Sequence, residues 1–149
     1  QTSDRNEKQD IEELSEAEQR VAISAKGLLR KFRWKDKVLS KGDEARTHFG
    51  IIAQDLQVAF EAEGLDAGDY AMFISTTWWE AERVVPALEA IEEVLDDDGN
   101  VVTEAVEAVD EHTLINSFDT LEKAPEDAVE RTRMGVRYSE LLAFIISAL

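Results

Sequence analysis

Acidic side chains are concentrated in one internal block of this 149-residue chain, and this concentration constrains the fold more than any other feature. Residues 89–127 hold 14 aspartates and glutamates and one basic residue, Lys123, while the whole chain has a net charge of −17. The block therefore carries −13, and the rest of the chain is close to neutral. We therefore interpret the chain as a nearly neutral body with an acidic insert, and we expect the insert to lie outside the core of that body.

Length and composition exclude several classes of protein. A length near 150 is typical of one domain. The absence of cysteine excludes disulfide frameworks and thiolate metal sites, and two histidines, His48 and His112, argue against a zinc enzyme. The negative charge argues against nucleic acid as a partner. No apolar run is long enough to cross a membrane, and no secretion signal is expected.

The acidic block still contains many β-branched residues, so it is expected to be structured. The segment 87–92 is echoed at 105–110, and Asp98-Gly99 lies between the two copies. An Asp-Gly step between apolar runs is a strong hairpin signal. We therefore predict an out-and-back arm over about residues 84–128. Its apolar spacing of three leaves strand and helix both open.

The body reads as a mixture of helices and strands. A stripe from Ile11 through Leu14 to Ala25 predicts a helix that stops at Gly27. Alternation over 28–35 predicts a strand with Phe32 and Trp34 inward. The remaining predictions are a loop over 36–46, a short strand over 47–52, a helix over 54–63 ending at Gly64, and strands over 69–79 and 134–138.

The last segment, residues 140–149, predicts a helix with Ser139 as its N-cap and Glu140 in the first turn. Its apolar residues cover nearly the whole circumference of that helix. A helix of this kind must be buried on all sides. Since nothing in the sequence remains to cover it, we expect other copies of the chain to do so in a homo-oligomer.

Three clusters contain side chains that could take part in a reaction or in binding. The first is Ser3-Asp4-Arg5-Asn6-Glu7-Lys8, in which a desolvated lysine would act as base toward a serine hydroxyl. The second is Arg46-Thr47-His48-Phe49-Gly50-Ile51-Ile52-Ala53-Gln54, and the third is Met134-Gly135-Val136-Arg137-Tyr138-Ser139-Glu140-Leu141-Leu142. Each alone is weak: a serine and a lysine five apart also fit a helix cap followed by solvated charges.

Taken together and in this order, the three clusters resemble the C-terminal intramolecular chaperone domain of phage tail fibres, tailspikes and endosialidases. The resemblance runs from Ser3 to Leu149 and is weakest in the acidic arm. It implies an α+β fold: a small antiparallel sheet with helices, a long protruding acidic arm, and an apolar C-terminal helix in an intertwined homotrimer.

The resemblance also implies a function. Such a domain trimerises, guides the folding of an upstream β-rich fibre or tailspike of the same polypeptide, and then cuts itself off. On this mapping the cut falls between Thr2 and Ser3, so residues 1–2 are a remnant of the fibre and 3–149 form the chaperone and autoprotease domain. The expected place is the host cell cytoplasm during phage assembly, with the released domain absent from the mature virion.

The site residues follow from the same mapping. Ser3 matches the nucleophile of a serine-lysine dyad and Lys8 its general base. Lys8 must be neutral to accept a proton, and a nearby cation such as Arg5 would favour that form. His48 matches a histidine of the family, for which we expect a role in positioning the cleavage segment. No cofactor, metal, nucleic acid or membrane is implied.

Two other interpretations remain open. The chain could be a non-enzymatic trimeric assembly domain that stays attached to its fibre. It could also be a small acidic binding protein for cations, since Asp96, Asp97, Asp98 and Asn100 superficially resemble a calcium loop. That loop lacks the alternating ligands and the distal glutamate of an EF-hand. Trp34, Trp78 and Trp79 could form a sugar platform, but aromatics on predicted strands are more often core.

Overall fold

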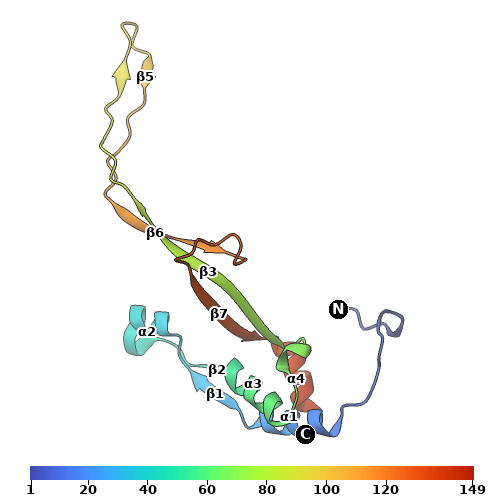
Figure 1. Ribbon diagram of the computed structural model, residues 1–149. Coiled ribbons are helices and arrows are strands. Elements are labelled where there is room, and N and C mark those ends of the chain that lie inside the picture. The colour runs from blue at the N-terminus through green and yellow to red at the C-terminus, as the bar shows by residue number, and fades with distance from the viewer. The chain divides into compact units, whose positions relative to one another are not determined.

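The computed structural model describes all residues from Gln1 to Leu149. The chain divides into two compact units, one made of residues 1–75 and 134–149 and the other of residues 76–133 (Figure 1). Helices and small separate sheets occur together, so the predicted α+β class is confirmed. None of the helices is long and apolar enough to cross a membrane.

The first unit contains the four α-helices and a two-stranded sheet. In chain order its elements are η1 (Arg5–Glu7), α1 (Glu16–Lys26), β1 (Leu29–Phe32), α2 (Lys35–Lys41), η2 (Gly42–Glu44), β2 (His48–Ile51), α3 (Ala53–Ala62), η3 (Ala67–Asp69) and α4 (Tyr138–Ile146). β1 and β2 pair antiparallel, with Phe32 opposite His48 and Arg30 opposite Gly50. The strand predicted over 47–52 and the helix that ends at Gly64 are both confirmed; Gly64 has a φ of 71°, which favours glycine.

The core of this unit lies between α1, α3 and α4. The largest fully buried side chains are Val21, Leu56, Phe60 and Leu141. The Phe60 ring stacks on Tyr70 with ring centres 4.6 Å apart, and on Phe144 at 6.0 Å. Burial of apolar area of this kind is the main favourable term in folding.

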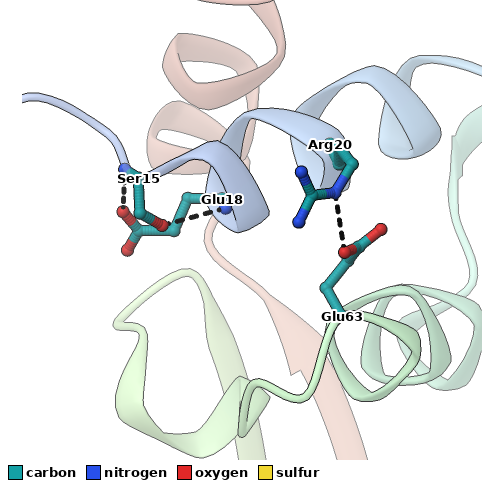
Figure 2. A network of polar contacts seen from close by, with 4 residues as sticks. All are labelled: Ser15, Glu18, Arg20 and Glu63. Atoms are coloured by element: carbon teal, nitrogen blue, oxygen red, sulfur yellow. Dashed lines mark hydrogen bonds and ion pairs between the residues drawn. The ribbon is translucent and has the colours of Figure 1, made fainter.

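The start of α1 is fixed by a reciprocal cap (Figure 2). The Glu18 N–H donates to Ser15 Oγ at 3.1 Å, and the Ser15 N–H donates to Glu18 Oε1 at 2.7 Å. Tyr70 Oη donates to the other Glu18 oxygen at 2.8 Å. The pKa of Glu18 is lowered, mainly by the bond from the Ser15 N–H and then by the bond from Tyr70. The pKa of Tyr70 is raised to about 12, mainly by burial and then by its bond to Glu18. Arg20 Nε also donates to Glu63 at 2.8 Å, which links α1 to the end of α3.

Four local predictions for this unit are wrong. The first helix begins at Glu16, not Ile11, because the capping box at Ser15 starts it. The segment predicted as a loop over 36–46 is helical, as α2 and η2. Trp34 is not an inward strand residue: it is the N-cap of α2 and 53% exposed. Ser139 lies inside α4, whose N-cap is Arg137.

The last helix is only partly buried in the single chain. Leu141 and Ile145 are buried, but Leu142, Ile146 and Leu149 are exposed in the single chain. Only one face of α4 therefore finds cover within its own chain.

The second unit is built from strands. β3 (Phe73–Val85) and β7 (Val129–Val136) each run from one unit into the other, and β3 lies between β6 (His112–Phe118) and β7 in a three-stranded sheet. β3 and β6 pair antiparallel from Trp79 with Phe118 to Val85 with His112. On this sheet Trp78 Nε1 donates to Glu80 at 2.9 Å, and the Arg133 guanidinium lies 5.3 Å from the centre of the Trp78 ring.

Beyond that sheet the chain continues as an antiparallel ribbon, here called the acidic ribbon, residues 86–111. Isolated bridges pair Leu88 with Val109 and Ile91 with Val106, and β4 (Val94–Leu95) pairs with β5 (Val101–Thr103). Gly99 takes a φ of 84° at the turn, as its Asp-Gly signal predicts. The backbone is thus extended rather than helical, and every side chain of the ribbon is exposed.

Candidate functional site

The first cluster lies on an exposed N-terminal segment. Asp4 caps the short η1 helix by accepting from the Asn6 N–H at 2.9 Å. This turn brings the chain back on itself, so that Lys8 Nζ donates to Ser3 Oγ at 2.8 Å. The structure therefore places the two residues of the expected dyad in direct contact, with the hydroxyl within reach of proton transfer to the amine.

The other residues expected to support the dyad are placed differently. Arg5 lies in the turn between Ser3 and Lys8, and its guanidinium makes no hydrogen bond. His48 lies on β2, and its ring packs on Phe32 with centres 5.9 Å apart and on Trp34 at 6.1 Å. No hydrogen bond joins His48 to Ser3 or Lys8. His48 thus belongs to an aromatic cluster rather than to the dyad.

That aromatic cluster forms one wall of a groove of about 810 Å³ in the first unit, here called the aromatic groove. Ile51, Ile52, Met134 and Val136 contribute apolar side chains to it, and Arg33, Lys35 and Asp36 contribute charge. Phe32 and Trp34 meet edge to face with ring centres 5.0 Å apart. A concave, mainly apolar surface with a few charged groups is typical of a binding site.

The second and third clusters meet at the back of this groove. The Ile51 N–H donates to Tyr138 Oη at 3.2 Å. The Tyr138 hydroxyl lies directly against Gly50, where a Cβ would overlap it, so only glycine leaves room for this contact. Sequence reasoning missed this pairing, although glycine in the second cluster and tyrosine in the third were its signals.

Arg137 makes the adjoining contact. The backbone N–H of Arg137 donates to the Met72 carbonyl at 2.8 Å, and its guanidinium donates to the Ala71 carbonyl. Arg137 and Tyr138 together fix the start of α4 to segments at residues 50–51 and 71–72. The motif that contains them is therefore structural in this chain, since it orders the groove rather than reaching the dyad.

No group of three or more histidine, cysteine, aspartate or glutamate residues is placed to hold a metal ion. In the turn of the acidic ribbon, Asp96 accepts from the N–H groups of Asp98 and Asn100 at 2.9 and 2.8 Å. The bond from Asn100, ahead of the others, lowers the pKa of Asp96. This carboxylate is engaged in forming the turn.

Comparison with known proteins points to one family. Residues 3–65 match the peptidase S74 model, described as chaperone of endosialidase. Over 115 residues, 71% of the chain, it is 37% identical to a probable tail spike protein of Klebsiella phage 0507-KN2-1. Over 48 residues, 32% of the chain, it is 48% identical to a tail spike protein of Escherichia virus K5. The chain spans only 9% and 8% of the length of these two relatives.

Solved structures show the same relationship. The crystal structure of a novel intramolecular chaperone matches 98% of the chain and 93% of its own, with a TM-score of 0.54 and 27% identity. The C-terminal domain of the bacteriophage T5 L-shaped tail fibre, with its intramolecular chaperone domain, matches 99% of the chain and 28% of its own, with a TM-score of 0.59. At 20% identity the second likeness shows the fold alone. The resemblance seen in the three sequence clusters is thus confirmed: residues 3–65 match the chaperone of endosialidase family, and the chain as a whole resembles a solved intramolecular chaperone.

Proposed function

We propose that this chain trimerises, guides the folding of an upstream β-rich tail fibre or tailspike segment of its own polypeptide, and then releases itself by cutting the Thr2–Ser3 bond. The observation that carries the release step is the 2.8 Å contact between Lys8 Nζ and Ser3 Oγ. The peptidase name of the matching family model supports it. We place these events in the host cell cytoplasm during phage assembly.

The proposed chemistry is a single-turnover acyl shift followed by hydrolysis. Ser3 Oγ attacks the carbonyl carbon of Thr2 while its proton passes to neutral Lys8, which then protonates the Ser3 nitrogen as the peptide bond breaks. The product is an ester between Thr2 and the Ser3 hydroxyl. Water cleaves this ester to give a Thr2 carboxylate and a free Ser3. Because nucleophile and carbonyl are neighbours in the chain, no encounter is needed.

Lys8 is exposed in the single chain. A lysine in water carries a proton and cannot accept another, whereas burial favours its neutral form. The proposed reaction therefore requires that Lys8 lose contact with water when the chain assembles. Cleavage would then follow folding and trimerisation rather than precede them.

Two surfaces support the chaperone role. The exposed apolar residues of α4, among them Ile146 at 64%, are available to pack against other copies. The acidic ribbon exposes the apolar pairs Leu88 with Val109 and Ile91 with Val106. We propose that these pairs contact the folding fibre transiently, and that the surrounding negative charge keeps the ribbons soluble after release.

The release step is tested in a chain that carries the natural fibre segment upstream of Gln1. A denaturing gel should show a fragment that begins at Ser3, and Ser3→Ala and Lys8→Ala should each abolish it. Ser24→Ala and Lys26→Ala, at exposed positions of α1, are matched controls that should cut normally. Cleavage of Lys8→Ala at the normal rate would refute the assignment of the base. No cleavage in any version would favour a non-enzymatic assembly domain.

The ribbon is tested separately by deleting residues 88–109. Because the acidic ribbon belongs to the second unit, the first unit should still fold and trimerise. The yield of correctly folded fibre should fall. A normal fibre yield would refute the proposed contact with the client.

A further inference from the structure

The N-terminal segment that carries the dyad, residues 1–14, is here called the N-terminal arm. Every residue of it is exposed. Beyond contacts within the arm, its one hydrogen bond to the body is from the Gln19 amide to the Leu14 carbonyl at 3.1 Å. It nevertheless carries two apolar side chains, Ile11 at 58% and Leu14 at 37% exposed. These two apolar side chains are available to pack on another surface.

The charge of the arm has an opposite counterpart at the aromatic groove. The arm contains five acidic and two basic residues. Within the segment of residues 30–46, which holds seven basic and three acidic residues, residues 32–36 line the groove, and among them Arg33 and Lys35 lie beside Asp36. The lining of the groove thus combines apolar side chains with Arg33 and Lys35. This is complementary to an acidic segment with two apolar side chains, and such complementarity directs association.

We infer that the N-terminal arm of one copy of the chain lies in the aromatic groove of a second copy. Ile11 and Leu14 pack against the apolar lining near Ile52, and Glu12 and Glu13 face Arg33 and Lys35. The inference rests on the proposed self-cleavage, because it explains how assembly activates the dyad. Within one chain the arm makes no hydrogen bond to any residue of the groove.

This arrangement has a direct consequence for the chemistry. Ser3 and Lys8 precede Ile11 by eight and three residues, so seating Ile11 holds the dyad of one copy against the body of another. Lys8 is then withdrawn from water, which favours the neutral amine that the reaction requires. The active site of each copy is complete only with the groove of its neighbour.

The test uses the absence of cysteine in the chain, which makes engineered pairs unambiguous. Full-length chains with Ile11→Cys and chains with Ile52→Cys, distinguished by tags of different length, are co-assembled and treated with copper–phenanthroline. Ser3→Ala is present in both chains, so the readout does not depend on cleavage. We expect a disulfide-linked pair containing one chain of each kind.

The control replaces Ile52→Cys by Leu39→Cys, a residue that is 90% exposed and outside the groove. Arg33→Glu with Lys35→Glu should lower the yield of the mixed pair several-fold, and Glu12→Lys with Glu13→Lys should restore it. A mixed pair no more abundant than that of the Leu39→Cys control overturns the inference. So does an internal disulfide in a chain carrying both Ile11→Cys and Ile52→Cys, together with none between chains.

The two proposals fail separately. If Ser3→Ala abolishes cleavage but no mixed pair forms, the self-cleavage stands and the docking of the arm is wrong. If the mixed pair forms while no chain is ever cut, the docking stands and the assigned chemistry is wrong.

Discussion

Gly50→Ala tests whether the contact with Tyr138 fixes the aromatic groove. An added Cβ would overlap Tyr138 Oη and lie 3.2 Å from Tyr138 Cζ and 3.3 Å from the Phe32 ring. Overpacking of this kind costs about 1–3 kcal/mol. Displacing the hydroxyl also breaks its bond with the Ile51 N–H, which adds about 0.5–1.5 kcal/mol. We expect Gly50→Ala to lower the free energy of unfolding by about 1.5–4.5 kcal/mol.

The assay is urea unfolding of four chains: the original, Gly50→Ala, Tyr138→Phe and the double variant. Because Tyr138→Phe removes the oxygen that the new Cβ would meet, Gly50→Ala should cost on the order of 1 kcal/mol less in that background. Gly135→Ala is the matched control, since an added Cβ there meets no atom within 4 Å. Equal costs of Gly50→Ala in both backgrounds would refute the role given to the hydroxyl.

Four further predictions concern the first unit. Ser15→Ala should lower the free energy of unfolding by about 1 kcal/mol, read from urea midpoints, because α1 loses its cap. Tyr70 should titrate by absorbance near pH 12, and Glu18→Gln should lower its pKa. Because the pKa of Tyr70 is raised in the folded state, its contribution to stability is complete below about pH 10 and is lost as the pH rises through 12. Leu141→Ala should cost about 2–5 kcal/mol. Ile146→Asp should leave the fold of the single chain intact but convert the proposed trimer to monomers in sedimentation, and a trimer that persists in this variant would contradict the role proposed for α4.

The local elements that the sequence predicts well are those whose signals are short-range. The turn at Gly99 and the end of α3 at Gly64 each follow from a glycine within a few residues of the element. α2 was missed because its only apolar residues, Val38 and Leu39, are adjacent and it buries none of its residues, so it has no apolar period to detect. The N-cap of α4 was misplaced because Arg137 is held there by the carbonyls of residues 71 and 72, which are distant in sequence.

In the candidate site, too, the contacts between residues near in sequence were predictable and the contacts between distant residues were not. Ser3 and Lys8 are five residues apart, and a single turn capped by Asp4 is enough to bring them into contact. The aromatic groove is assembled from β1, β2 and the residues before α4, and no local sequence pattern predicts it. The sequence gives Trp34 and His48 separate expected roles, as an inward strand residue and as a residue that positions the cleavage segment. Only the antiparallel pairing of β1 with β2 brings the two side chains together.

The ester intermediate tests the central claim most directly. The chain with its natural upstream segment is allowed to assemble in the presence of hydroxylamine, which attacks esters, and both products are identified by intact mass. The proposed mechanism predicts a downstream fragment of residues 3–149 and an upstream fragment that ends in a Thr2 hydroxamate. A cut at any other bond, or normal cleavage with only a carboxylate at Thr2, would contradict it.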